Sequence, residues 1–255
     1  ITGQNVVGNP YAPETIDPQV VKIAQNAAHY AVQKPDEVTD LVDFKQPEIS
    51  DTDLKAPIYI DFGPTSLSAT PWNNITSHQE SSTTSWIKDV ENNYTNIGVR
   101  VLDGFTATHA GVGSEPASPV TVDGVEFPLT AWKDGLLVKG EKNQGDVGPG
   151  RIEISQLDVA RKYNFTILAI RFNGSKDARI SSYKLVGKTE SAVKEVKTGI
   201  KDAASFAAAN FEEYIAKFEN VEPDSEGKVI VEVKGLDTGS AAEGHINALC
   251  ISLAK

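Results

Sequence analysis

Alternating apolar and polar residues mark residues 156–187 as the longest stretch of β-strand pattern in the chain. The first part predicts a strand with apolar side chains on both faces: Tyr163, Phe165, Ile167 and Ala169 on one, Leu168 and Ile170 on the other. A strand of this kind is covered on both sides, as in the middle of a sandwich. The polar residues 173–177 favour a turn, and a return strand is expected from residue 179 to residue 186.

Shorter segments of the same character follow at intervals of about ten residues, separated by turn-forming residues. Asp123-Gly124 predicts a tight hairpin turn between two of them. The alanine-rich residues 202–209 are compatible with a helical turn. For residues 210–218 we prefer a strand, because strand-like segments surround them. The spacing is typical of a mainly β fold, a β-sandwich or jelly roll. We expect strands at residues 58–62, 86–90, 96–109, 120–122, 125–127, 151–154, 192–197, 228–233 and 245–253, and a further element at 132–138.

The N-terminal residues follow a different pattern. Asp17-Pro18 is typical of a helix start, with a capping carboxylate followed by proline at the first helical position. Small apolar residues then recur at helical spacing, and Lys34-Pro35 ends the predicted helix. The sequence therefore predicts a loop and short helix in residues 1–35, an acidic surface linker at 36–55 and a β-sandwich domain at 56–255.

The net charge of −11, from 24 basic and 35 acidic residues, bears on the class of partner. Nucleic-acid binding through phosphate neutralisation needs a basic stripe, and the sequence has none. An anionic membrane surface is disfavoured for the same reason. No run approaches the ~20 apolar residues that span a bilayer. We therefore predict a domain with neither a nucleic-acid partner nor a membrane span.

Residues that bind metals or act as nucleophiles form no recognisable motif. Cys250 lies in an apolar run, which favours a buried hydrophobic side chain over a nucleophile. The acidic residues Asp36, Glu37, Asp40 and Asp43 match no calcium-loop spacing, so a solvated linker is favoured for them. The sequence predicts no cofactor and leaves a structural calcium ion as an open alternative.

Catalytic motifs are likewise missing from the sequence. The four histidines lie in no His-Glu-x-x-His frame, and no Gly-x-Ser-x-Gly occurs. An acid–base pair would need Glu243-Gly244-His245 to meet His78 and Glu80, and nothing in the sequence brings them together. A glycosidase with paired carboxylates stays open, because acidic residues are numerous.

Two stretches resemble known families. Residues 1–34, with TGQNVVGNPYAP followed by AQNAAHYAV, resemble the C-terminal end of SGNH-hydrolase-like proteins from Bacteroidetes. In such enzymes the catalytic serine, the oxyanion-hole residues and the Asp-x-x-His pair lie upstream, and none is present here. The resemblance implies that residues 1–35 are the tail of a preceding, missing hydrolase-like domain, an SGNH-type serine esterase.

The second resemblance covers residues 57–253. The order IYIDFG, SATPWNN, NIGVRVLDGF, ISQLDVARKYNFTILAIR, SSYKLVG and GHINALCISL is similar to the galactose-binding-like β-sandwich modules appended to polysaccharide-degrading enzymes. It implies a galactose-binding-like jelly roll, a glycan as partner, and a periplasmic, cell-surface or secreted location. Such folds host many binding roles and some structural ones, so the resemblance implies a fold more firmly than a ligand.

Sugar recognition needs an aromatic plane and polar groups for the hydroxyls. Trp72 with Asn73 and Asn74 has that chemistry in a turn-rich segment. The alternative, which we favour, is that Trp72 packs as a hydrophobic side chain at one end of the sandwich and that the asparagine side chains hydrogen-bond to backbone groups of the turn. Trp132 lies near a turn, and binding and core packing carry equal weight there.

Arg171 and Arg179 flank the polar loop of the central stretch. In a jelly roll such a loop lies at one rim, where two guanidinium groups would make bidentate hydrogen bonds to sugar hydroxyls or carboxylates. The alternative, which we favour, is ordinary surface charge.

Three functions remain open from the sequence. The first is a non-catalytic carbohydrate-binding accessory β-sandwich of a secreted, polysaccharide-acting esterase. The second is a structural or interaction domain with no sugar ligand, which two fully buried tryptophans would favour. The third is a hydrolase in its own right.

Overall fold

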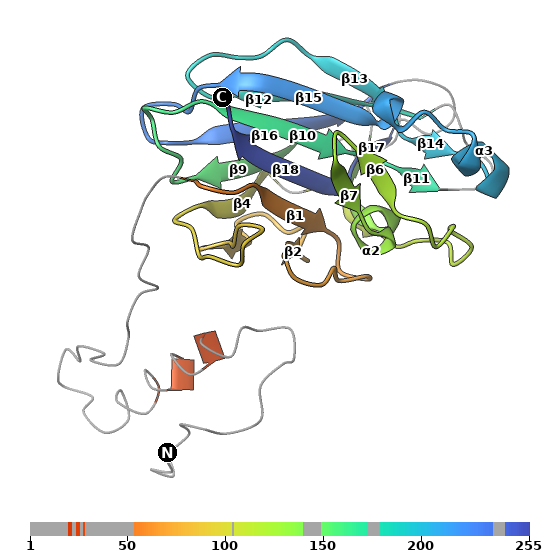
Figure 1. The fold of residues 1–255 in the computed structure, drawn as a ribbon, viewed down its shortest axis with the longest axis horizontal. Coiled ribbons are helices and arrows are strands. Elements are labelled where there is room, and N and C mark those ends of the chain that lie inside the picture. The colour runs from red at the N-terminus through yellow and green to blue at the C-terminus, as the bar shows by residue number, and fades with distance from the viewer. Residues whose placement is uncertain are drawn as a thin grey trace. The chain divides into compact units, whose positions relative to one another are not determined.

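The computed structural model describes residues 20–21, 24–25, 28, 54–103, 105–139, 149–172, 179–236 and 243–255. The chain divides into two compact units, Ile1–Glu48 and Ile49–Lys255. In the first unit the five described residues are helical, as expected there. The rest of the predicted helix, the acidic linker cluster and the loop at 173–177 lie outside the described residues. The second unit is a β-sandwich, so the predicted mainly β fold class is confirmed (Figure 1).

One sheet of the sandwich has five strands in the order β15-β10-β18-β1-β2. The pairs are antiparallel except β1 with β2, which are parallel. In β10 the buried Tyr163, Phe165 and Ile167 alternate with half-buried residues, as expected of a strand with one face in a core. The strands are β1 (Ile58–Phe62), β2 (Trp72–Ile75), β10 (Tyr163–Leu168), β15 (Ile215–Val221) and β18 (Ala248–Leu253).

The facing sheet has six strands in the order β13-β12-β16-β9-β4-β3, all antiparallel. The chain passes repeatedly from one sheet to the other, from β9 to β10, β12, β15, β16 and β18 in turn, as in a jelly roll. These strands are β3 (Thr83–Thr84), β4 (Gly98–Asp103), β9 (Gly150–Ser155), β12 (Ile180–Val186), β13 (Lys194–Lys197) and β16 (Val229–Gly235).

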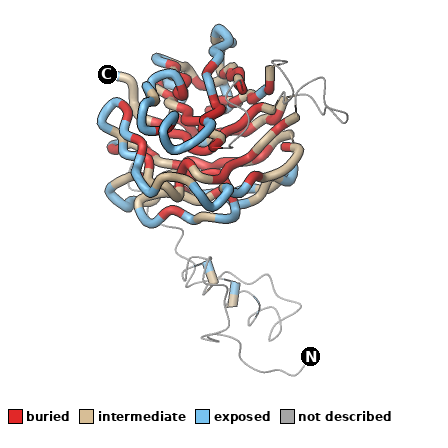
Figure 2. Tube along the Cα trace, turned by 90° about the vertical axis from the view of Figure 1, so that its right-hand side faces the viewer, coloured by how far each residue is buried: buried red, intermediate tan, exposed pale blue. Residues whose placement is uncertain are grey.

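The main core lies between these two sheets. Ile60 and Phe165 from one sheet share a cluster with Ile154 and Val231 from the other, and all four are fully buried. Figure 2 shows the buried residues gathered between the sheets and the exposed ones along the loops. Burial of such side chains contributes about 1.5–3 kcal/mol each, which makes this core the main source of stability.

A second hydrophobic cluster covers the outer face of the five-stranded sheet at one end. Leu168 and Ile170, from the face of the β10 stretch that points away from the main core, belong to it. The prediction that this stretch is covered on both sides is therefore confirmed. The cover comes from the hairpin β6 (Val120–Val122) and β7 (Val125–Phe127), α2 (Leu129–Lys133), α3 (Ala203–Ala207) and the 3₁₀ helix η1 (Phe211–Tyr214).

At the same end, two strands of the five-stranded sheet break and continue outside it. Asn247 separates β18 from β17 (Glu243–Ile246). Its side chain accepts a hydrogen bond from Ile170 N at 2.7 Å and donates to the carbonyls of Trp132 and Asp134 at 3.0 and 2.6 Å. The continuations build two small sheets, β11 (Arg171–Phe172) with β14 (Gly199–Ile200), and β17-β8-β5 with β8 (Gly135–Lys139) and β5 (Ala107–His109).

Several predicted elements were wrong in type or extent. Residues 96–109, expected as one strand, form β4 and β5 in different sheets, and residues 245–253 form parts of β17 and β18, which Asn247 separates. Residues 86–90 are not a strand: Trp86 has φ of 55°, and Lys88 forms only an isolated bridge with Tyr94. The element at 132–138 is α2 followed by β8, because Trp132 is held in the second cluster. In residues 210–218, η1 precedes β15, since Phe211 and Tyr214 share one face of a helical turn. The helical turn that the sequence allowed in residues 202–209 is present as α3.

In the part of the chain that the structure describes, no helix is long and apolar enough to cross a membrane. The Asp123-Gly124 turn is confirmed, with φ of 50° and 76° at its two residues. Both angles are positive, as the two-residue turn between β6 and β7 requires.

Candidate binding site

The backbone of Thr198 joins Arg171 and Arg179 at one end of the sandwich. Arg171 N donates to Thr198 O at 2.5 Å, and Thr198 N donates to Arg179 O at 2.9 Å. Arg171 begins β11 and Arg179 immediately precedes β12. Arg179 is only 4% exposed and Arg171 is half-buried. The favoured alternative of ordinary surface charge is therefore wrong for Arg179.

Two buried histidines belong to the same cluster. His109 on β5 pairs with Gly135 of β8, and His245 on β17 pairs with Leu137, two residues further along β8. Both imidazoles therefore project from the same face, with ring centroids 5.0 Å apart and an interplanar angle of 81°. Gly135 leaves room for them, because a Cβ there would come within 3.0 Å of His109 Nε2.

His109 links this pair to the arginines. Arg171 Nη1 donates to His109 Nδ1 at 3.0 Å and to the carbonyl of Ala110 at 2.9 Å. Because Nδ1 accepts, the proton of the neutral ring lies on Nε2. Burial, together with the neighbouring His245 and the charge of Arg171, holds the pKa of His109 well below its usual range, so this ring is neutral.

Glu243 supplies the acidic group of the cluster. Its Oε2 lies 3.0 Å from Nη2 of Arg179 and 3.6 Å from Nε2 of His245, which is too long for a hydrogen bond. The contact with His245 and the charge of Arg179 hold the pKa of Glu243 at about 2, against the desolvation that burial brings. Burial lowers the pKa of His245, so the carboxylate faces a guanidinium and a neutral imidazole.

The cluster holds most of the buried polar atoms without a partner. In the described part of the chain eleven buried side-chain nitrogen and oxygen atoms lack a hydrogen bond, and seven lie on the five residues Arg171, Arg179, His109, His245 and Thr198. Native proteins leave few such atoms, and each calls for a physical explanation such as a ligand or an ordered water. We define these five residues and Glu243 as the arginine–histidine cluster.

The other predicted site residues have structural roles. Asn73 Nδ2 donates to the carbonyls of Tyr59 and Lys88 at 2.9 and 2.8 Å, and Lys88 N donates back to Asn73 Oδ1. Asn74 exchanges two hydrogen bonds with the backbone of Ser68. The amides of both asparagines thus satisfy backbone groups, as the favoured alternative has it.

The two candidate tryptophans differ in exposure. Trp72 is half-buried and its ring lies 5.0 Å from that of Tyr59 and 5.7 Å from that of Phe127. Trp132 is 0% exposed and stacked on Phe206 with centroids 5.0 Å apart. The ring of Trp132 has no free face for a ligand, so we leave it out of the proposed site.

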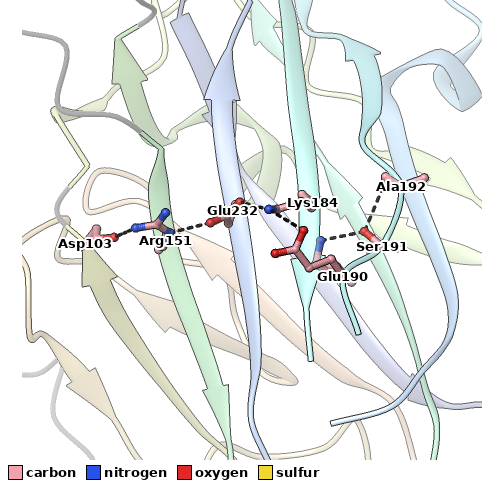
Figure 3. A network of polar contacts seen from close by, with 8 residues as sticks. Asp103, Arg151, Lys184, Glu190, Ser191, Ala192 and Glu232 are labelled. Atoms are coloured by element: carbon pink, nitrogen blue, oxygen red, sulfur yellow. Dashed lines mark hydrogen bonds and ion pairs between the residues drawn. The ribbon is translucent and has the colours of Figure 1, made fainter. Parts of the chain in front are cut away.

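A shallow groove of about 380 Å³ lies elsewhere, on the outer face of the six-stranded sheet. Its charged groups are already paired in a row across the strands, as Figure 3 shows: Arg151 contacts Asp103 and Glu232, and Lys184 contacts Glu232 and Glu190. Its one aromatic lining residue, Tyr183, is 1% exposed with its hydroxyl bonded to the carbonyl of His245. The groove thus offers paired charges and no exposed ring.

Two buried carboxyl groups form a further polar site. Asp134 Oδ2 accepts from the backbone N–H groups of Thr65 and Ser66, and Asp61 Oδ2 accepts from that of Ser68. Burial and the neighbouring Asp134 raise the pKa of Asp61 to about 7, and burial also raises that of Asp134. Each carboxyl group holds loop backbone through its Oδ2 atom, so we assign the pair a structural role.

His109, His245 and Glu243 were not identified as site residues from the sequence. His245 meets His109 and Glu243, whereas His78 contacts Gln79. Strands β5 and β17 are far apart in the sequence and meet only through β8, so local patterns carry no signal for this grouping. Among the described residues, no group of three or more His, Cys, Asp or Glu side chains is placed to hold a metal ion.

No protein-family model matches the chain, and no curated protein matches it. Among solved structures, the ANX2 ectodomain from Arabidopsis thaliana has a TM-score of 0.41 at 9% identity, covering 69% of this chain and 48% of that one. TmCBM61, solved with β-1,4-galactotriose, has a TM-score of 0.28 at 13% identity and coverages of 58% and 90%. The CBM36-1 domain of a xylanase from the hindgut metagenome of Trinervitermes trinervoides has a TM-score of 0.27 at 11% identity, with coverages of 58% and 98%. The chain thus spans about half of the ANX2 ectodomain, and the function has to be argued from the site.

Proposed function

We propose that this chain is a non-catalytic, glycan-binding accessory β-sandwich of galactose-binding-like type, and that it binds its ligand at the arginine–histidine cluster. The observation that carries the proposal is the concentration of seven unpartnered buried polar atoms on five residues at one end of the sandwich. Guanidinium and imidazole N–H groups are donors that suit the oxygen-rich surface of a sugar. Ligand sites in β-sandwiches also gather at the ends of the strands, where this cluster lies.

The parent protein is a separate part of the proposal. From the resemblance of residues 1–35 we propose a preceding SGNH-type esterase domain, joined through residues 36–55, and a periplasmic, cell-surface or secreted location. In that arrangement the sandwich holds the enzyme on its polysaccharide, and chemistry belongs to the upstream domain.

Calorimetric titration of the purified chain against a panel of neutral and acidic oligosaccharides tests the binding proposal. We expect at least one glycan to bind, and Arg171→Ala to abolish that binding. Arg151→Ala is the matched control, because it removes the same charge from the groove on the outer sheet face. Loss of binding in the control alone would move the site to that groove, and no binding by any glycan would contradict the proposal.

A structural or interaction role is the second candidate. The full burial of Trp132 and the satisfied amides of Asn73 and Asn74 favour it, because they remove three residues from any sugar site. Two fully buried tryptophans would favour this role more strongly, but Trp72 is only half-buried. This candidate predicts that the arginine–histidine cluster serves stability alone and that Arg171→Ala changes no binding constant.

A further inference from the structure

The charges of the arginine–histidine cluster are unequally paired. Arg179 has the carboxylate of Glu243 at 3.0 Å, whereas Arg171 makes no ion pair in the described part of the chain. Its bonds go to an imidazole nitrogen and a backbone carbonyl, both neutral acceptors. A half-buried cation with only neutral acceptors is costly, since burial of a charge is offset mainly by an opposite charge.

The neighbouring acidic groups do not supply that opposite charge. Glu243 and Glu115 act on Arg171 only through space: Glu243 pairs with Arg179, and the carboxylate of Glu115 accepts from the backbone N–H groups of Val112 and Gly113. Burial and the adjacent Arg179 lower the pKa of Arg171, which shows that its cationic form is held in an unfavourable setting. An added anion at this point would relieve both effects.

Glu243 shows what kind of group suits the cluster. Its carboxylate lies against Arg179 and points one oxygen toward His245, with a side chain that is 24% exposed. It thus reaches the buried guanidinium from the partly exposed side of the cluster. A planar carboxylate pairs with a guanidinium through two parallel N–H···O bonds.

We infer that the arginine–histidine cluster selects glycans that carry a carboxylate, such as uronic acid units, with Arg171 as the anchoring cation and Glu243 as a resident carboxylate that competes for Arg179. The inference rests on the proposed glycan-binding function and adds the class of sugar. Arg171 and Glu243 are the partly exposed members of the cluster, so the sugar carboxylate would contact Arg171 first, whereas the unpartnered Nε and Nη1 atoms of Arg179 are buried behind it.

Titration with trigalacturonic acid, its fully methyl-esterified form and a sulfated galactotriose tests this inference. The ester keeps the sugar rings and removes the charge. We expect the acid to bind at least about tenfold more tightly than the ester. Arg171→Gln should remove this preference, and Arg151→Gln, the control with the same loss of charge, should keep it. A preference for the sulfated sugar over the acid would overturn the carboxylate assignment.

The outcomes separate the two levels of the proposal. Equal affinity for acid and ester would overturn this inference and leave the glycan-binding function standing. No binding by any of these sugars or by the wider panel would overturn the function itself. Glu243→Gln, with its fold checked by circular dichroism, should bind the acid several-fold more tightly and the ester unchanged. An unchanged or weaker affinity for the acid would remove Glu243 as a competitor.

Discussion

Nη2 of Arg179 lies 3.0 Å from Oε2 of Glu243, in an ion pair whose arginine side chain is 4% exposed and whose carboxylate side chain is 24% exposed. The burial of the guanidinium makes the pair asymmetric. Loss of the carboxylate leaves a desolvated cation, whereas loss of the arginine leaves a carboxylate that water still reaches. The stability of this end of the sandwich therefore depends on Glu243 more than on a typical surface acid.

We predict that Glu243→Gln lowers the free energy of unfolding by about 3 kcal/mol, because Arg179 loses its counter-charge in a buried site. Urea unfolding of both proteins measures the change. Glu222→Gln is the control, since Glu222 pairs with the exposed Lys162 and Lys188 and its loss should change stability much less. Equal effects of the two substitutions would contradict the buried pair.

Stability should fall as pH rises through the range in which Asp61 ionises. Its pKa in the folded chain is about 7, above the ordinary 3.8, so the folded state binds more protons than the unfolded state between these values. The free energy of unfolding therefore decreases from about pH 4 to about pH 7, by up to about 4 kcal/mol from this group.

Urea unfolding at pH 5 and pH 8 tests this pH dependence. Asp61→Asn should be more stable than the wild type at pH 8, because the amide carries no charge beside Asp134 and still accepts from Ser68 N. The difference between the two proteins should shrink at pH 5. A constant difference at both pH values would show that Asp61 does not titrate in this range.

Trp132→Ala should destabilise the fold by about 4 kcal/mol, since it opens a cavity in a fully buried cluster and removes the stack on Phe206. Trp86→Ala provides the comparison, because Trp86 is half-buried and should cost markedly less. Thermal or urea unfolding measures both. If Trp132→Ala abolished glycan binding without loss of stability, its assignment to the core would be wrong.

The thiol of Cys250 should be unreactive in the native protein. Burial raises its pKa to about 12, so almost none of it is thiolate at neutral pH. A disulfide-exchange reagent should label one thiol in urea and none in buffer within the same time. Rapid labelling of the folded chain would contradict the placement of Cys250 on the covered part of β18.

The sequence predicted the elements whose burial follows a simple period. In β1 the apolar residues Ile58, Ile60 and Phe62 occupy alternate positions and are fully buried, and the β10 stretch showed apolar residues on both faces because a second cluster covers it. Elements that depend on tertiary contacts were missed. Leu129–Lys133 is only five residues long, too short for a periodic signal, and becomes helical as Trp132 packs on Phe206.

The candidate site was predicted only in part, because some of its residues are close in sequence and others are brought in by tertiary contacts. Arg171 and Arg179 flank one loop, so their proximity was visible in the sequence, whereas their burial was not. His109, Glu243 and His245 reach them through β5 and β17, which only the three-stranded sheet brings together. The long-range pairing that creates the site leaves no trace in local residue patterns.

Amide hydrogen exchange with and without the tightest-binding oligosaccharide of the titration panel tests the central claim, that this end of the sandwich binds a glycan. The account predicts slower exchange on ligand addition in β5 and β17, which carry His109, Glu243 and His245, and unchanged exchange in β9 and β16 beneath the outer groove. Protection confined to β9 and β16, or no protection anywhere in the chain, would contradict it.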